Sequence, residues 1–327
     1  MVLLIAIIAL ALIFDYTNGF HDTANAIATS VSTRALSPRF AVVMAAGLNL
    51  IGALVSTSVA KTVGEGLVDT ELVSLGLVLA ALIGAVFWNF ATWYFGIPSS
   101  SSHALFGGII GAMIAKAGVG GVMWSGVIEK IILPMIGSPV IGFVTAWLLM
   151  TGLIWLVRKR QQAPVNTWFR RLQPISAGFM AFSHGANDAQ KTMGVIALAL
   201  FASGEIETFT IPFWVKLVCA LAMAAGTYSG GWRIIHTLGS KVIKLDPIHG
   251  FAAETAAASV IQVATHFGIP VSTTHTITAA IMGVGSTQRL SAVRWGVAGN
   301  IVTAWVLTLP AAGLVAAGVY LAGVALF

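Results

Sequence analysis

Residues 15–31 read DYTNGFHDTANAIATSV, a stretch that carries charge, amides and glycine inside an otherwise apolar segment. A related stretch, HGANDAQK, occupies residues 184–191, and the two share the pattern G-x-[H/N]-D-x-x-[N/K]. The pattern aligns four pairs of residues: Gly19 with Gly185, His21 with Asn187, Asp22 with Asp188, and Asn25 with Lys191. Such a doubling indicates that the chain is built from two related halves.

The composition around these stretches is that of a membrane protein. Of the 327 residues, 57% are hydrophobic and 9% are charged, and the mean hydropathy is +0.92. Soluble domains carry about a quarter charged residues. Apolar runs recur at roughly the 20 residues that a spanning helix needs, without the alternation of a β-barrel strand. The sequence therefore predicts an all-α, polytopic helical membrane protein.

Charge and cysteine content exclude several other classes of protein. The net charge of +6 is not a nucleic-acid footprint, because membrane proteins collect Lys and Arg in their cytoplasmic loops. The single cysteine, Cys219, leaves no disulfide or thiolate metal site and is interpreted as a small buried hydrophobe. Residues 1–14 lack a basic start and a cleavage site, so we interpret them as the beginning of the first span rather than a secretory signal.

A second duplicated block follows each signature. FGIPSSSSHALFGGIIGAMI, from Phe95, matches HFGIPVSTTHTITAAIMGVG from its Phe267, with FGIP identical and with His103 and His275 in register. The apolar part after each proline is too short to cross, which predicts a re-entrant helix in each half. The predicted organisation is a first repeat at 1–157, a basic linker at 158–171 and a second repeat at 172–327. Within the first repeat, Pro134 and Pro139 predict two helices between 122 and 157.

The distribution of charge predicts how the halves are oriented. The linker places its basic residues in the cytoplasm by the positive-inside rule: Arg158, Lys159, Arg160, Arg170 and Arg171. The loop at 61–71 sets Lys61 against Glu65, Asp69 and Glu71, whereas its counterpart is basic, with Arg233, Lys241 and Lys244. We therefore expect inverted repeats with five crossings each and Met1 outside. Arg289 and Arg294 disagree, since they would then lie outside. Inverted repeats are typical of secondary transporters, which bind substrate near the midplane.

The signature residues predict a site for a coupling ion. Asp22 and Asn25 are three residues apart and share a helix face with Thr29. A carboxylate at membrane depth needs a cation, a proton or a partner. Asp22 and Asp188 are thus expected to bind sodium or take up a proton. The alternative is a structural contact between helices and, for Asp188, an ion pair with Lys191.

The helix starts after each FGIP predict a site for an anion. Ser99 to Ser102 and Ser272 to Thr274 open the two short helices. A helix start offers unpaired N–H groups and partial positive charge, so two such starts could grip a tetrahedral oxyanion. The alternative is ordinary N-capping.

The remaining polar residues have structural and functional interpretations. His103 and His275 are expected to anchor the re-entrant helices, with proton relay as the alternative. Ser102 and His103 are adjacent on a helix and point apart, which argues against a nucleophilic enzyme. Glu129 and Glu254 are further candidate carboxylates, and Asn89 and Gln262 are expected to be helix-packing contacts.

The two signatures, NGFHDTANAIAT and HGANDAQKTMGVIALAL, resemble the paired signatures of the inorganic phosphate transporter (PiT) family over nearly the whole chain, and in particular its bacterial low-affinity branch. The resemblance implies phosphate symport with a cation, with no other cofactor, at the meeting point of the re-entrant helix starts and the signature helices. The residues assigned to phosphate are Ser100, Ser101, Ser102, Ser272, Thr273, Thr274 and Lys191. Those assigned to the coupling ion are Asp22, Asn25, Asp188, Asn187 and His21, with Asp22, Asn25 and Asp188 as ligands if the ion is sodium.

Two departures bear on the coupling ion. His21 and Lys191 replace asparagines of the sodium-coupled pattern, and a fixed ammonium beside Asp188 could take the role of one sodium. We therefore favour protons over sodium. The expected partners are inorganic phosphate and membrane lipid, in the inner cell membrane, and a homo-oligomer is compatible with the glycines at 107, 108 and 111. Alternatives are a carrier of another oxyanion or of metal-phosphate complexes, an anion channel, and an intramembrane hydrolase.

Overall fold

A computed structural model describes residues 1–65, 67–68 and 72–326, and within these ranges the regular structure is helical apart from one isolated bridge between Val68 and Val122. The first half contains α1 (Val2–Ser32), α2 (Pro38–Val55), α3 (Ser58–Glu65), α4 (Leu75–Phe95), α5 (Ser101–Ala117), α6 (Trp124–Val127) and α7 (Leu133–Val157). The second contains α8 (Gln162–Ala202), α9 (Phe213–Ser229), α10 (Trp232–His236), α11 (Pro247–His266), α12 (Thr273–Ser286) and α13 (Trp295–Leu326). The prediction of an all-helical membrane protein is confirmed.

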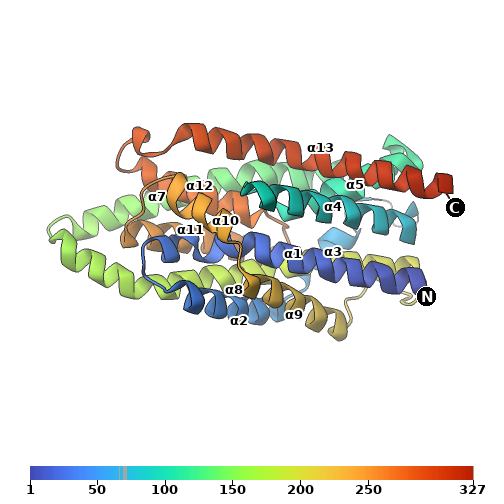
Figure 1. Cartoon of the computed structure of the whole chain (residues 1–327), viewed down its shortest axis with the longest axis horizontal. Helices are drawn as coiled ribbons and strands as arrows, with labels where there is room; N and C mark the ends of the chain where they lie inside the picture. The colour runs from blue at the N-terminus through green and yellow to red at the C-terminus, as the bar shows by residue number, and fades with distance from the viewer. Residues whose placement is uncertain (66, 69–71, 327) are drawn as a thin grey trace.

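The helices of the two halves pack in matching pairs. α1 packs against α9 as α8 packs against α2, and α5 packs against α13 as α12 packs against α7. Figure 1 shows that α5 runs from the middle of the molecule towards the end that holds both termini, whereas α12 runs from the middle towards the opposite end. Their orientation relative to a membrane stays a prediction.

The glycines of the two signatures allow these pairs to approach closely. A Cβ added to Gly19 on α1 would lie 2.3 Å from the carbonyl oxygen of Met223 on α9, and one added to Gly185 on α8 would lie 2.2 Å from that of Asn49 on α2. Both positions therefore exclude any side chain, since such contacts are far inside van der Waals distance. The signature glycines are a packing requirement, and each half packs its signature helix against the other half.

The glycines of α5 also make contacts within the chain. A Cβ on Gly107 would lie 2.3 Å from the Leu309 carbonyl oxygen, and one on Gly111 would lie 2.1 Å from that of Gly313, both on α13. Gly108 faces Ala81 on α4 in the same way, at 2.4 Å. These small residues thus serve packing between helices of one chain.

The sequence predicted more crossings than the number of helices that are long and apolar enough to span a membrane. Among the described residues, five stretches are long and apolar enough to span: α1, α2, α4, Trp124–Val157 and α13. A sixth is α9 together with residues 232–241, which are bent by 60° relative to it. This selection is by length and apolarity alone and omits α8, which carries the second signature, so the expected five crossings per half stay a prediction. The chain turns back at residues 96–100 and 267–272, and α5 and α12 each start in the middle of the molecule, which is the arrangement expected of re-entrant helices.

The segment from Trp124 to Val157 forms one continuous span, although its prolines predicted two helices. A π-helical turn at Ile128–Ile132 joins α6 to α7. Pro134 directly follows this turn, and Pro139 lies further inside the helix. A π turn widens the helix locally, and membrane helices tolerate proline when such adjustments satisfy the freed backbone groups.

Arg289 and Arg294, which disagreed with the predicted topology, lie at the end of the molecule that holds the basic linker. Arg158, Asp246 and Gln288 line one cavity, which places the end of α12 beside the linker. The backbone N–H of Arg294 donates to the carbonyl of Val242 at the same end (3.0 Å). Placing Arg289 and Arg294 outside was thus wrong, because α12 returns to the linker end instead of crossing.

Most of the predicted linker is helical, whereas part of the acidic loop lies outside the described residues. α8 begins at Gln162, so most of the predicted linker at 158–171 is the first part of that helix. Of the acidic loop that the sequence set at the other end, Asp69 and Glu71 lie outside the described residues, as does the side chain of Glu65.

Candidate functional site

The two signatures and the two re-entrant helix starts meet in the middle of the molecule. α1 supplies the first signature and α8 the second, and the rings of His103 on α5 and His275 on α12 lie 4.8 Å apart between their centroids. All the predicted site residues are buried, none more than 3% exposed: His21, Asp22, Asn25, Asn187, Asp188, Lys191, Ser100, Ser101, Ser102, Ser272, Thr273 and Thr274. The structure therefore encloses the site from solvent.

Asp22 accepts hydrogen bonds from both sides of this centre. His21 Nδ1 lies 2.8 Å from Asp22 Oδ1, and the hydroxyl of Thr274 donates to the same oxygen at 3.3 Å. The other nitrogen of His21 lies 3.1 Å from the hydroxyl of Thr92 and 3.4 Å from that of Ser99. His21 thus links the first carboxylate to α4 and to the loop before α5.

Asp188 is held by a cation and a hydroxyl. Lys191 Nζ contacts Asp188 Oδ1, and the Thr273 hydroxyl donates to Asp188 Oδ2 at 2.9 Å. Lys191 also donates to the Ser102 hydroxyl at 2.5 Å and to the carbonyl of Val271 at 2.7 Å. An ammonium has three donors, so its hydrogen bonds are fully used. The ion pair expected between Asp188 and Lys191 is present, and it ties α8 to both helix starts.

The two signature amides point in different directions. Asn25 donates to the hydroxyls of Thr273 at 3.2 Å and Thr274 at 2.9 Å, so it faces the start of α12. Asn187 donates to the hydroxyl of Thr265 at 2.8 Å and the carbonyl of Ile269 at 3.3 Å, so it faces the end of α11 and the loop beyond it. The structure therefore brings Asn25 to the centre and sets Asn187 at its edge.

The residues of the helix starts have separate tasks. Ser100 and Ser272 are N-caps, and each accepts from the backbone N–H of the histidine three residues on, at 3.2 Å. The capping alternative is confirmed for these two. The hydroxyls of Ser102, Thr273 and Thr274 contact Lys191 or the carboxylates, as described above. That of Ser101 is buried without a hydrogen-bond partner among the residues that the structure describes.

The two histidines of the re-entrant helices are held partly by stacking. His275 stacks on Trp305 with 3.9 Å between ring centroids, and Trp305 Nε1 donates to the carbonyl of Pro98 at 3.1 Å. Contact between the rings of His103 and His275 then joins the two helix starts. Aromatic contact, which the sequence did not predict, therefore contributes to anchoring both helices.

His184 is a residue of the site that sequence reasoning missed. Its Nε2 lies 3.3 Å from Asp188 Oδ2 and 3.9 Å from Asp22 Oδ2, between the two carboxylates. Its Nδ1 lies 3.0 Å from the amide oxygen of Asn49. One signal was available, because His184 precedes Asp188 by four residues and shares its helix face.

Asp22, His184 and Asp188 form a group that could hold a metal ion. One ligand atom from each lies within 4.8 Å of the others. Two carboxylates and an imidazole are ordinary metal ligands. The two carboxylates predicted to bind sodium are thus close together, with the imidazole of His184 added to them.

The further carboxylates lie outside this centre. Glu129 is exposed. Glu254 on α11 is fully buried and accepts hydrogen bonds from Thr29, from Ser30 at 2.5 Å, from Gln173 at 3.4 Å and from Ser176. Asn89 donates to Thr17 at 3.2 Å, which confirms its packing role between α4 and α1.

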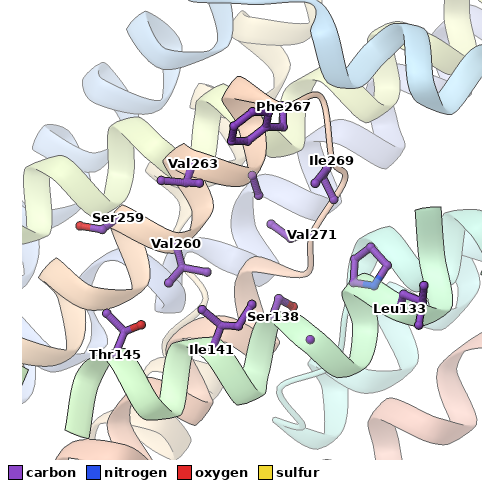
Figure 2. A pocket seen from close by; sticks show the side chains of 13 residues that line it. Leu133, Ser138, Ile141, Thr145, Ser259, Val260, Val263, Phe267, Ile269 and Val271 are labelled. Carbon is purple, nitrogen blue, oxygen red and sulfur yellow. The ribbon is translucent and has the colours of Figure 1, made fainter. Parts of the chain in front are cut away.

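A cavity of about 480 Å³ lies beside the site between α7 and α11 (Figure 2). Most of its lining is apolar, including Ile141, Val260 and Phe267. Val271 lines it too, and the Val271 carbonyl accepts from Lys191. An apolar lining does not fit an anion, so the polar centre, rather than this cavity, is the candidate substrate site.

Comparison with known proteins gives consistent matches. The model of the phosphate transporter family matches residues 18–316. The chain is 53% identical over 322 residues to a probable low-affinity inorganic phosphate transporter of Rhizobium meliloti, covering 98% of this chain and 96% of that protein. It is 46% identical to a protein of the same description in Bacillus subtilis, covering 98% and 97%. A solved structure described as the sodium-dependent phosphate transporter has a TM-score of 0.91 at 27% identity, with all of both chains covered.

Proposed function

The chain belongs to the phosphate transporter family, and from this premise we propose that it carries inorganic phosphate into the cell together with a cation, by alternating access. The convergence of Lys191 and two hydroxyl-rich helix starts on the signature carboxylates is the observation that carries the proposal. Transport also agrees with the several apolar helices of a multi-pass membrane protein. The inner cell membrane is the proposed location.

Phosphate would bind between the starts of α5 and α12. The first-turn N–H groups of each helix have no intrahelical acceptor, and they favour negative charge. The hydroxyls of Ser101, Ser102, Thr273 and Thr274 add donors, and Lys191 adds a fixed positive charge. Ser100 and Ser272, which were assigned to phosphate, would act through capping instead.

The membrane potential explains why a cation must accompany the anion. Each negative charge moved inward costs about 2.3 kcal/mol per 100 mV of inside-negative potential. Asp22 and Asp188 would take up protons or sodium and complete the site. The ammonium of Lys191 contacts three oxygens, those of Asp188, Ser102 and the Val271 carbonyl, and would take the place of one sodium ion. The similar solved structure, by contrast, is described as a sodium-dependent transporter. We favour protons, with His21 and His184 as further acceptors beside the carboxylates.

Rocking of the two halves would expose the filled site to the inside. The matched packing of α1 with α9 and of α8 with α2 supports two units that move relative to each other about the site. An inverted arrangement of the units is part of this proposal.

Selectivity for phosphate would come from a carboxylate that accepts its hydrogen. Sulfate has no hydrogen near neutral pH, so an acceptor at Asp22 would be left unpaired and sulfate rejected. The test is uptake of labelled phosphate into proteoliposomes with excess unlabelled sulfate, for the wild type and for Asp22→Asn. We expect sulfate to compete only in the variant. Normal phosphate uptake with sulfate still excluded would show that Asp22 does not select the substrate.

The same vesicles separate the alternatives. Phosphate uptake that requires Mg²⁺ and stops with a chelator would indicate a metal-phosphate complex as the substrate. A carrier exchanges internal for external phosphate, whereas a channel shows flux without counterflow. Loss of hydrolytic turnover in Ser102→Ala with binding intact would instead favour an intramembrane hydrolase.

A further inference from the structure

Asp15 is a buried carboxylate that the proposed site does not use. It lies on α1, seven residues and about two turns before Asp22, and it is 0% exposed. Neither of its oxygens has a hydrogen-bond partner within the described ranges of the chain. An unpaired carboxylate in a membrane protein interior is costly, so one with no partner calls for a bound cation or proton.

Two other buried polar side chains with unpartnered oxygens lie near this carboxylate. Asn18 on the next turn of α1 and Thr192 on α8 both lie within interaction range of Asp15. The amide oxygen of Asn18 and the hydroxyl oxygen of Thr192 are themselves buried and have no partner in the part of the chain that the structure covers. Thr192 and Asn18 offer neutral donors at most, so neither balances the charge of Asp15, and their own oxygens have no other partner. Oxygens of these kinds are the ligands that hard cations prefer.

The charged and titratable groups around Asp15 do not neutralise it. Asp188 and His184 face it from α8, and the thiol of Cys219 faces it from α9. His184 is already placed between the carboxylates of Asp22 and Asp188. Lys191 is committed to three other oxygens. The surroundings of Asp15 therefore lack one positive charge.

The position of Asp15 has no counterpart in the second half. Aligning Asp22 with Asp188 pairs Asp15 with Ala181, which is buried in an apolar cluster. A requirement of the duplicated fold would place a polar residue in both halves. Because α1 begins at Val2, Asp15 lies on the side of Asp22 nearer the first residues of the chain, away from the basic linker.

We propose that Asp15, with Asn18 and Thr192, binds a monovalent cation that is transported with phosphate, in addition to the cation taken up at Asp22 and Asp188. The inference rests on the proposed function of phosphate symport. A proton on the carboxylate and a sodium ion among the four oxygens satisfy the same chemistry, and the experiment distinguishes them. The extra cation would raise the number of charges that enter with each phosphate.

The test compares the wild type with Asp15→Asn and Asp15→Glu in proteoliposomes, first under a pH gradient with choline as the only other cation, then under a sodium gradient at equal pH. Each proton coupled to transport multiplies the accumulation ratio by roughly ten per pH unit of gradient. We expect Asp15→Asn to lose about that factor under the gradient of the bound cation and Asp15→Glu to restore accumulation, with phosphate–phosphate exchange measured in parallel to show that each variant is folded. The cation is identified by the gradient, of protons or of sodium, under which Asp15→Asn accumulates less phosphate than the wild type. Unchanged accumulation under both gradients would overturn the proposal.

A second measurement covers the case in which Asp15→Asn does not fold and loses exchange as well. Cys219 is the one cysteine in the sequence, so its S–H stretching band can be assigned in the infrared spectrum of the wild type. Because this thiol faces Asp15, cation binding there should shift the band, either on lowering the pH without sodium or on adding sodium at fixed pH. A band that moves in neither titration would refute the site. Failure of the wild type to take up phosphate would refute the proposed function, and the band would still test Asp15.

Discussion

Replacing Lys191 by asparagine removes a buried ammonium from a position where three oxygens meet. The side chain is 1% exposed and donates to Asp188, to Ser102 and to the carbonyl of Val271. Asn25, the aligned residue of the first signature, already contacts hydroxyls of the facing helix start, so asparagine is compatible with this environment. If the ammonium replaces a sodium ion, Lys191→Asn should create a requirement for sodium.

The size of the effect follows from the loss of one partner of a buried ion pair. Such a loss costs about 3–5 kcal/mol, because the other charge stays buried and unpaired. For a protein of 327 residues that corresponds to a fall in Tm of roughly 4–7 °C. Sodium bound at the vacated position would recover part of this: a ligand at 100 times its Kd contributes about 2.7 kcal/mol.

The assay is thermal unfolding of the purified protein in detergent, in sodium chloride and in choline chloride of equal ionic strength. Lys191→Asn should melt well below the wild type in choline and partly recover in sodium, and its phosphate uptake should become sodium-dependent. Lys159→Asn is the matched control, since Lys159 is exposed at the linker and should respond to neither change. A Lys191→Asn variant that melts like the wild type in both salts would refute the reasoning.

Three further predictions address the helix starts, the packing and the pH dependence. Ser101→Ala should raise the KM for phosphate by roughly 10- to 150-fold, because a hydrogen bond to a charged group contributes about 1.5–3 kcal/mol. Ser100→Ala should instead lower the stability by about 1 kcal/mol, because it removes the helix cap. Equal KM values for the two variants in uptake assays would contradict this. Gly226→Ala should destabilise the fold by about 1–3 kcal/mol, because the added Cβ would lie 2.1 Å from the Tyr16 carbonyl oxygen. Gly318→Ala is the control: no atom lies within 4 Å of its Cβ, so its stability should be unchanged or higher. Chemical denaturation that gives both variants the same effect would be inconsistent with the packing. Burial lowers the pKa of His249 below 6.5 despite the opposing charge of Asp246, so the unfolded chain takes up a proton first as the pH falls through about 6.5. Stability should then fall with decreasing pH by at most about 1.4 kcal/mol per pH unit, and a His249→Gln variant that melts with the same pH dependence would exclude this histidine as the cause.

Much of the fold could be predicted because its boundaries depend on local chemistry. The duplicated FGIP blocks combine proline with capping hydroxyls, and α5 and α12 begin at or directly after these hydroxyls. The continuous span from Trp124 to Val157 could not be predicted, because the sequence gives no sign of the π turn that precedes Pro134 and keeps the segment helical. The same limit applies to Arg289 and Arg294, whose side of the molecule depends on where α12 turns back.

The candidate site was predictable where the two halves repeat each other. Asp22 and Asp188 align, and the structure brings both to the same helix starts. His184 aligns with Asn18, and Asp15 aligns with Ala181, so neither residue is repeated in the other half. A comparison of the halves selects positions that both share, and it therefore passes over these two residues. Their importance depends on which groups face them across helices, and that information lies in the packing rather than in the pattern.

Labelled phosphate uptake into proteoliposomes, under an imposed pH gradient and under an imposed sodium gradient at the same membrane potential, tests the central claim most directly. Symport with protons predicts accumulation under the pH gradient alone, with choline replacing sodium throughout. A strict sodium requirement would contradict the interpretation of Lys191 as a built-in replacement for sodium. Accumulation under neither gradient would contradict phosphate symport itself.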